Sequence, residues 1–517
     1  MTKENPIAII PEPVHCELTG GHFVLAETTG IFSEGPCKKA PGILRQALRP
    51  ATGFRFPDAR DVRAANIRFV EMKGLAPEGY QLEVTASGVE IRAGSDAGFF
   101  YAIQTLRQLL PPEIFRTEPV DGMEWAVPCV KIEDHPRFGW RGMMLDTARH
   151  YFPVEDITRF LDHMALYKYN VFHWHLVDDQ GWRLEIKRYP RLVEIGSIRA
   201  ESPRPGHRNE GDGIPYGDYY TQEEVRNIVR YAAERHIKVV PEIEMPGHSG
   251  AAIAAYPELG NSDVPDYQPE VKTRWGVNPY IYAPSETVFD FLQNVLSEVF
   301  ELFPSEYIHV GGDEAPKEQW KQSAFAQSVM QRGGLANEER LQSWFLRRME
   351  EFLSSRGKRL IGWDEIQEGG LSPNATMMLW RDWKWARAAL NAGNSVIMTP
   401  ASHCYLDYSQ GPIKTEPEAI CGELRLERAY SFEPIPDGIV PGAEARVLGI
   451  QGNIWTEYIR DRDYLDFMTW PRAAALAEIA WSPRQGRSWK SFSAKLPRHA
   501  RLLKEQGIRF RPLDIEP

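Results

Sequence analysis

Short runs in which apolar and polar residues alternate occupy the first part of the chain, as far as about Glu133. These runs are bounded by Gly and Pro and cover residues 8–11, 67–70, 80–84 and 89–92. A period of two favours antiparallel strands with one face toward solvent. Residues 96–110 carry apolar residues at helical spacing, which predicts one amphipathic helix. We therefore expect a small α+β domain with an antiparallel sheet over residues 1–135.

From Gly139 onward, apolar segments alternate with longer amphipathic ones. The candidate strands are residues 140–147, 171–178, 238–245, 307–313, 359–364, 376–381, 395–400 and 447–456. Most of these segments are apolar without strict alternation, as in a parallel sheet that is covered on both faces. Eight such strands with helices between them predict a (β/α)8 TIM barrel with insertions over residues 136–517.

Two of the connecting segments carry local signals. Thr221 with Glu224 three residues later is the signature of a capping box at the start of a helix. The link before the sixth candidate strand is short and contains Gly369, Gly370 and Pro373. Gly and Pro disfavour helix, so we expect no full helix in that crossover.

Polar and aromatic residues gather at the ends of these candidate strands. In such barrels the catalytic residues lie at the carboxyl ends of the strands. Almost every end here carries a carboxylate, and four carry a Trp. A single Trp most often packs in a core, but the shared position of Trp363, Trp380 and Trp455 favours a sugar-binding wall. Carboxylates and an Arg beside such walls form directional hydrogen bonds to hydroxyl pairs.

The four-residue sequence Gly311-Gly312-Asp313-Glu314 ends the fourth candidate strand. The two Gly allow backbone or substrate to approach closely. Adjacent carboxylates in a desolvated site oppose each other's ionisation, so the pKa of one of them rises. Such a pair suits one protonated acid and one carboxylate. The alternative is a charged turn before a helix, where acidic residues are also favoured.

Composition narrows the classes of function. The chain has 517 residues and a formal net charge of −11, without a Lys/Arg block, so nucleic acid is not an expected partner. Its apolar runs are far shorter than the ~18 residues of a membrane span. The five Cys are widely spaced and odd in number, and the start lacks an apolar leader, so we expect a cytoplasmic protein. The sequence does not indicate an oligomeric state.

Three segments, in order, resemble glycoside hydrolase family 20, the β-N-acetylhexosaminidase family. They are Arg141-Gly142-x3-Asp146-Thr147-Ala148-Arg149-His150, then Tyr169-Asn170-Val171-Phe172-His173-Trp174-His175-Leu176-Val177-Asp178-Asp179, then His309-x-Gly311-Gly312-Asp313-Glu314. The resemblance extends from about residue 136 to about residue 482, and the front domain also resembles the small domain before the barrel in that family.

The resemblance implies a retaining, substrate-assisted mechanism, in which the 2-acetamido oxygen of the sugar attacks C1 and forms an oxazolinium intermediate. By the family's roles, Glu314 would be the general acid and then the base. Asp313 would accept the acetamido N–H and stabilise positive charge, and Tyr405 would donate its hydroxyl to the acetamido oxygen. The substrate would be a glycan with a terminal N-acetylhexosamine, and neither a cofactor nor a metal is implied.

The remaining family roles concern sugar binding and support of the acid. Arg149, Asp407 and Glu457 would bind sugar hydroxyls, while Trp363, Trp380 and Trp455 would line the pocket. Asp178 and His248 would orient and tune Glu314. The alternatives are a buried ion pair with Asp146 for Arg149 and a hydrogen-bonded core histidine for His248.

Two other classes of function compete with this interpretation. His173 and His175 lie on one face of a strand, and with Asp178 and His309 they suggest a metal-dependent hydrolase. Against it, the other strand ends offer no clear set of further ligands. A sugar-binding protein that has lost catalysis is the third class, but Asp313, Glu314 and Tyr405 are all intact. The long segments 202–220 and 252–282 are expected to form the aglycone rim, and they do not reveal the natural aglycone or the ratio of GlcNAc to GalNAc use.

Overall fold

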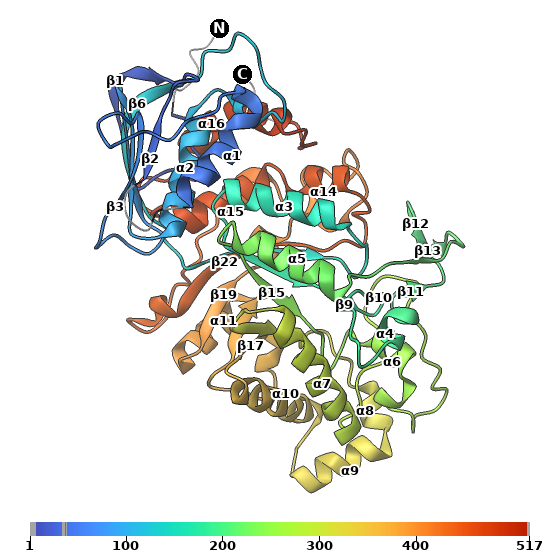
Figure 1. Cartoon of the computed structure of the whole chain (residues 1–517). Coiled ribbons are helices and arrows are strands. Elements are labelled where there is room, and N and C mark those ends of the chain that lie inside the picture. The colour runs from blue at the N-terminus through green and yellow to red at the C-terminus, as the bar shows by residue number, and fades with distance from the viewer. Residues whose placement is uncertain (1–6, 34–36, 38, 514–517) are drawn as a thin grey trace.

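A computed structural model describes residues 7–33, 37 and 39–513. The first domain is a six-stranded sheet with two helices packed on it (Figure 1). Its strands are β1 (His15–Val24), β2 (Ile31–Ser33), β3 (Ile67–Glu71), β4 (Tyr80–Thr85), β5 (Gly88–Ala93) and β6 (Ala126–Asp134). Its helices are α1 (Ala40–Thr52), α2 (Asp96–Leu109) and the 3-10 turn η1 (Pro112–Phe115). The helix and three strands expected between residues 67 and 110 are thus confirmed.

One expectation for this domain is wrong, and another, the antiparallel sheet, holds for the pairs β1–β6, β4–β6 and β4–β5 but not for β3. Residues 8–11 are buried but form no strand, because the amide of Gln108 on α2 takes the hydrogen-bonding place of a neighbouring strand. It accepts from the N–H of Ile10 (2.9 Å) and donates to the carbonyl of Ile10 (2.8 Å). The sheet is also mixed, since β3 pairs in parallel with β2 and β5. The β4–β5 hairpin places β5 beside β3, and these two strands run in the same direction.

The second domain is a closed barrel of eight parallel strands, which confirms the predicted architecture (Figure 1). The strands are β7 (Trp140–Asp146), β8 (Val171–His175), β15 (Lys238–Glu242), β16 (Tyr307–His309), β17 (Arg359–Trp363), β18 (Thr376–Leu379), β19 (Ser395–Met398) and β22 (Val447–Ile454). Each strand falls within its predicted segment and ends one to four residues earlier. Some polar residues at the predicted ends, such as Asp146 and Glu242, are therefore the last residues of their strands, whereas Asp313, Glu314 and Glu457 lie on the loops that leave the barrel.

The outer layer consists mainly of helices that follow the strands. The main ones are α3 (Val154–Leu166), α5 (Gln222–Ala233), α7 (Glu286–Leu302), α10 (Glu338–Ser355), α11 (Trp383–Ala392) and α15 (Arg472–Trp481). The predicted capping box of Thr221 and Glu224 is present at the start of α5. The crossover between β17 and β18 contains only the 3-10 turn η3 (Asp364–Gln367), as its Gly and Pro residues predicted.

Shorter elements decorate the loops around the barrel. They are β9 (Val177–Asp178), β10 (Gly181–Trp182), α4 (Arg191–Glu194), β11 (Ile198–Arg199), β12 (Pro203–Arg204), β13 (His207–Gly211), β14 (Tyr216–Gly217), α6 (Gly250–Ala255), η2 (Pro257–Leu259), α8 (Glu318–Gln322), α9 (Ala324–Gly333), α12 (Ala401–Cys404), β20 (Tyr408–Ser409), β21 (Ile420–Glu423), α13 (Leu426–Tyr430), η4 (Ala443–Arg446) and α14 (Arg462–Thr469). The last helix, α16 (Trp489–Glu505), packs against η1 of the first domain.

A buried polar contact joins the two domains. The ammonium of Lys168, which is fully buried, lies 2.8 Å from Oδ2 of Asp134 and 2.9 Å from the hydroxyl of Tyr80. The indole of Trp481 donates to the other oxygen of Asp134 (2.8 Å). Buried charges are stable only when they are paired in this way, so this contact fixes the first domain on the barrel.

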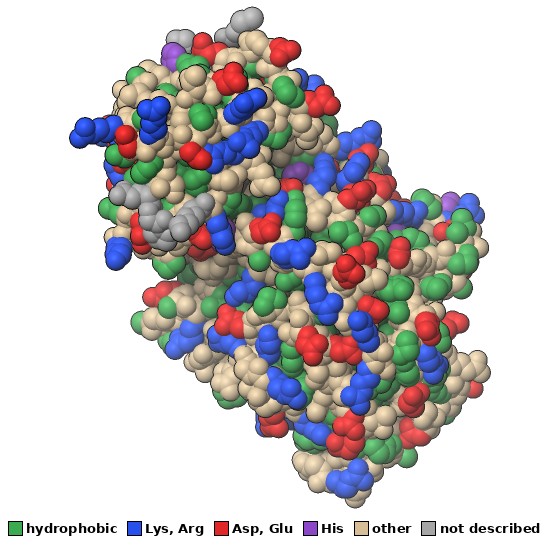
Figure 2. Space-filling view, viewed as in Figure 1, with side chains coloured by type: hydrophobic (Ala, Val, Ile, Leu, Met, Phe, Trp, Pro, Cys, Tyr) green, Lys and Arg blue, Asp and Glu red, His purple; other side chains and the backbone are tan. Residues whose placement is uncertain are grey.

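The outer surface shows no grouping of one charge on the face seen in Figure 2, where Lys and Arg are interspersed with Asp and Glu. Among the described residues, no helix combines the length and apolar character that a membrane crossing requires.

Candidate functional site

The strand-end residues singled out in the sequence meet at one end of the barrel. The guanidinium of Arg149 lies 5.1 Å from the ring of Trp455, which in turn lies 5.7 Å from Trp363. The rings of Trp380 and Tyr405 stack at 6.1 Å. Burial raises the pKa of Asp407, and the nearby carboxylate of Glu457 adds to the rise. Contacts therefore connect these residues into one pocket wall.

The backbone after β16 presents the adjacent carboxylates in an unusual conformation. Gly311 and Gly312 have φ angles of 65° and 91°, and Glu314 has a φ of 40°. A Cβ on Gly311 would lie 1.6 Å from Oε2 of Glu244, so only glycine fits there. A positive φ at a residue such as Glu314 costs about 1–3 kcal/mol and persists only where the surroundings impose it. The strained backbone thus indicates that the surrounding structure fixes the position of Glu314.

The two neighbouring carboxylates have different environments. The side chain of Asp313 is 11% exposed, whereas that of Glu314 is 42% exposed. Burial raises the pKa of Asp313 to about 7, with Glu242 and Glu314 adding to the rise and His248 opposing it. Contact with His248 lowers the pKa of Glu314. The sequence predicted that one pKa of this pair rises, and the structure identifies Asp313 as the residue concerned.

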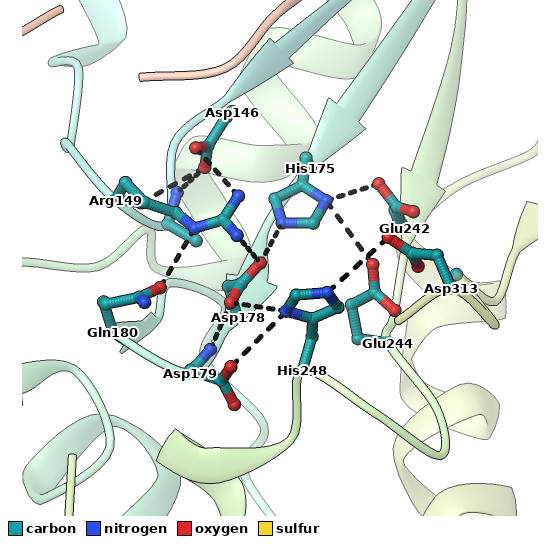
Figure 3. A network of polar contacts seen from close by, with 12 residues as sticks. Asp146, Arg149, His175, Asp178, Asp179, Gln180, Glu242, Glu244, His248 and Asp313 are labelled. Atoms are coloured by element: carbon teal, nitrogen blue, oxygen red, sulfur yellow. Dashed lines mark hydrogen bonds and ion pairs between the residues drawn. The ribbon is translucent and has the colours of Figure 1, made fainter. Parts of the chain in front are cut away.

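A chain of charged groups runs behind this pair (Figure 3). Nε2 of His248 lies 3.6 Å from a carboxylate oxygen of Asp313 and 3.6 Å from one of Glu314. Nδ1 of the same ring lies 3.2 Å from Oδ1 of Asp178. Although burial opposes it, Asp178 and Asp313 raise the pKa of His248 well above its usual range. The protonated form of His248, which faces both carboxylates, is therefore favoured.

Arg149 continues this chain of charges on the far side of Asp178. Its Nη2 lies 2.7 Å from Asp178, its Nη1 lies 3.2 Å from Asp146, and its Nε donates to Gln180 at 3.0 Å. The ion pair with Asp146 that the sequence suggested is thus present. A guanidinium has five N–H donors, so these three contacts leave two for a ligand.

Several residues of the site carried no distinctive sequence signal. Glu244 is buried, and neither of its carboxylate oxygens has a hydrogen-bond partner among the described residues. Burial, Asp313 and Glu242 raise the pKa of Glu244 well above its usual range. Burial also raises the pKa of Glu365 to about 8, with Asp313 contributing. Alternation along a strand indicates that Glu242 and Glu244 share a face, but not that their neighbours are acidic.

The residues of the alternative metal site form a network of their own. Glu242 lies 3.1 Å from His173 Nε2 and 2.7 Å from His309 Nδ1, and it accepts a hydrogen bond from the indole of Trp363 (2.8 Å). His175 contacts Glu242 through one ring nitrogen and Asp178 through the other. Although burial opposes it, Glu242 and Asp178 raise the pKa of His175 to about 10. A protonated imidazole has no lone pair for a metal, whereas burial lowers the pKa of His173 to about 4 and favours its neutral form.

Comparison with known proteins adds independent findings. The profile of the glycosyl hydrolase family 20 catalytic domain matches residues 138–484, and that of domain 2 of the same family matches residues 6–135. A beta-hexosaminidase from Porphyromonas gingivalis is 42% identical over 99% of this chain, which spans 66% of the length of that relative, just under two thirds. A beta-N-acetylhexosaminidase from Cellulomonas fimi is 32% identical, with 98% of this chain and 96% of the relative covered.

Solved structures agree with these sequence matches. A mutant Streptomyces plicatus beta-hexosaminidase in complex with the product GlcNAc superimposes with a TM-score of 0.86 at 33% identity, over 99% of this chain and 97% of the other. The exo beta-N-acetylglucosaminidase from Vibrio harveyi in complex with N-acetylglucosamine gives a TM-score of 0.87 at 33% identity, over 98% of this chain and 79% of the other.

Proposed function

Because this chain belongs to glycosyl hydrolase family 20, we propose that it is an exo-acting, retaining β-N-acetylhexosaminidase. It removes terminal non-reducing β-linked N-acetylglucosamine, and also N-acetylgalactosamine, from oligosaccharides or glycoconjugates. One observation carries the proposal: Asp313 and Glu314 are adjacent, yet one is buried and the other faces a cavity of about 430 Å³ that Trp380 and Arg381 also line. Two neighbouring carboxylates with different environments suit two different roles.

In the proposed reaction the acetamido oxygen of the substrate attacks C1 and Glu314 protonates the departing oxygen. The bond from C1 to the leaving group breaks as the oxazolinium ring closes. Asp313 accepts the acetamido N–H and stabilises the positive charge, while the hydroxyl of Tyr405 donates to the acetamido oxygen. Glu314 then removes a proton from the water that opens the oxazolinium at C1. Because the nucleophile belongs to the substrate, Asp313 does not need to reach C1.

Substrate binding adjusts the protonation of the pair. In the protein alone Glu314 has the lower pKa and Asp313 the higher one, which is the reverse of what the reaction needs. A bound sugar covers the exposed carboxyl of Glu314, and desolvation raises the pKa of an acid. The acetamido N–H donates to Asp313, and a hydrogen bond to the charged form lowers a pKa. The substrate itself therefore favours the transfer of the proton from Asp313 to Glu314.

The polar groups of the pocket offer partners for the sugar hydroxyls. Asp407 is 3% exposed, and among the residues described no side chain donates a hydrogen bond to its carboxylate oxygens. Burial and the neighbouring Glu457 raise the pKa of Asp407 well above its usual range. Buried acceptors of this kind are costly unless a ligand satisfies them. Hydroxyls donating to Asp407 and Glu457, with Arg149 donating to another, would satisfy them and fix the sugar between the Trp side chains.

Product analysis on a panel of defined oligosaccharides tests this function. We expect release of single N-acetylhexosamine residues from non-reducing ends only, first as the β-anomer when products are followed by NMR. Release of disaccharides or internal cleavage would contradict exo action. Initial formation of the α-anomer would contradict retention and with it the participation of the acetamido group.

Chelation separates this function from the metal-dependent alternative. We expect the hydrolysis of an aryl N-acetylglucosaminide to be unchanged after exhaustive dialysis against EDTA, because the proposed steps use carboxylates and the substrate's own oxygen. The rates are compared before dialysis, after dialysis and after readdition of Zn²⁺. A loss that Zn²⁺ restores would favour a metal centre at His173, Glu242 and His309. Binding of N-acetylglucosamine without any turnover would instead indicate a sugar-binding protein.

A further inference from the structure

Two side chains, one on α10 and one at the end of the loop itself, hold the loop of Asp313 and Glu314. The amide nitrogen of Gln342, on α10, donates to the carbonyl of Gly312 at 2.7 Å. The ammonium of Lys317 donates to the carbonyl of Ala315 at 2.6 Å and also to the amide oxygen of Gln342. The carbonyls immediately before and after the carboxylate pair are thus connected through one Gln and one Lys, which we call the Gln342–Lys317 clamp.

The loop needs such support because the barrel sheet no longer provides it. The N–H of Trp363, at the end of β17, donates to the carbonyl of Gly311 at 2.8 Å. Beyond Gly311 the chain turns away through the positive φ angles of Gly312 and Glu314. In the described part of the chain, the carbonyls of Gly312 and Ala315 are held by side chains. Those contacts stabilise a conformation that Glu314 rarely adopts by itself.

The clamp is built from groups that depend on each other. Gln342 is 2% exposed, and its amide is satisfied at one end by Gly312 and at the other by Lys317. A buried amide that loses a hydrogen-bond partner is destabilised, so the orientation of the Gln342 amide is well determined. Lys317 lines the same cavity of about 430 Å³ as Glu314. The clamp therefore connects helix α10 to the part of the cavity wall that carries Glu314.

We propose that Gln342 and Lys317 are positioning residues, which hold the carboxyl of Glu314 within reach of the leaving-group oxygen. The inference rests on the proposed role of Glu314 as general acid. A catalytic group has to be held within about 0.5 Å of its productive position, and a displacement of about 1 Å can lower a rate by roughly 10²-fold. Gln342 and Lys317 act through the backbone of Gly312 and Ala315.

The test compares two substrates that differ in their need for an acid. The disaccharide N,N′-diacetylchitobiose, called chitobiose here, has a poor leaving group that must be protonated. A 2,4-dinitrophenyl N-acetylglucosaminide has a leaving group that departs without a proton. We expect Gln342→Leu and Lys317→Met to lower kcat/KM for chitobiose by about 10–100-fold. For the dinitrophenyl substrate we expect a loss of less than about 3-fold, since the general acid contributes little there. The loss on chitobiose should lie in kcat, with KM nearly unchanged.

Control variants make the result specific to the clamp. Lys321→Met removes a Lys that is 55% exposed on the neighbouring helix α8 and should leave both substrates unaffected. Lys317→Arg keeps a donor near the carbonyl of Ala315 and should recover most of the chitobiose activity. Equal losses on both substrates, or a loss on neither, would overturn the proposal. If Gln342→Leu does not fold, as judged by circular dichroism, Lys317→Met alone decides the same question.

Glu314→Gln, measured in parallel, separates the failure of this inference from the failure of the proposed function. If Glu314→Gln shows the leaving-group-dependent loss and the clamp variants do not, only the positioning role is wrong. If Glu314→Gln loses nothing on chitobiose, the assignment of the acid is wrong and the clamp proposal fails with it.

Discussion

Glu314→Gln is expected to lower kcat/KM for chitobiose by about 10²–10⁴-fold, the range that general acid catalysis contributes. The amide keeps the size of the side chain but cannot deliver a proton to the departing oxygen. Glu314 is 42% exposed and its contact with His248 is 3.6 Å long, so we expect little change in folding. The measurement is steady-state hydrolysis of chitobiose by the wild type and the variant at the pH of maximal activity.

The leaving group provides the internal check on this result. With a dinitrophenyl N-acetylglucosaminide, the kcat/KM of Glu314→Gln should approach that of the wild type, since formation of the oxazolinium then needs no acid. Glu318→Gln, in which the replaced side chain is 65% exposed on α8, is the matched control and should behave as the wild type on both substrates. Near-normal activity of Glu314→Gln on chitobiose would mean that another residue is the acid.

The barrel could be predicted because each of its strands carries its own signal. All eight strands lie inside apolar segments that the sequence delimits, and the capping box of Thr221 and Glu224 placed the start of α5. The strand predicted for residues 8–11 is absent for a physical reason, because a strand forms only where a neighbouring strand can pair with it. The amide of Gln108, about a hundred residues away, binds this segment in place of a strand. The direction of β3 also depended on a distant pairing, with β5.

The predictions for the site differ in the same way, because some features depend on neighbouring residues and others on residues that are distant in the chain. Adjacency alone predicted that one carboxylate of the Asp313–Glu314 pair has a raised pKa. Which of the two it is depends on Glu242 and His248, which lie more than sixty residues away in the chain, and on the greater burial of Asp313. The position of Glu244 in the site could not be predicted from the sequence either, since its carboxyl occupies the space that Gly311 leaves open. The ends of the predicted strands thus indicated which residues meet in the site. The protonation states of these residues could be inferred only from the folded structure.

Asp313→Asn is expected to lower kcat by about 10²–10³-fold and to change KM little. In the proposed reaction the carboxylate stabilises a positive charge that is developed in the transition state and the oxazolinium but not in the bound substrate. An interaction that strengthens only in the transition state appears in kcat. Removal of one preorganised electrostatic contact costs roughly this much in other active sites. Hydrolysis of chitobiose and of an aryl N-acetylglucosaminide should show the loss equally, because the charge develops with either leaving group.

The pH dependence of Asp313→Asn gives the prediction a second, independent measurement. The pKa of Asp313 is about 7 in the protein alone, and in the proposed reaction its proton moves to Glu314 when the substrate binds. Wild-type kcat/KM should therefore fall as the pH rises through about 7, because the pair then has no proton to deliver, and in the Asn variant this limb should move to lower pH, where Glu314 alone titrates. The raised pKa also means that the folded wild type binds a proton more tightly than the unfolded chain, so this group's contribution to stability is lost as the pH rises from about 4 to 7. Asp313→Asn should therefore unfold at a higher temperature than the wild type at pH 8, with the difference shrinking toward pH 4. A variant whose only defect is a raised KM, with the limb near pH 7 retained, would show that Asp313 binds the sugar rather than stabilising the charge.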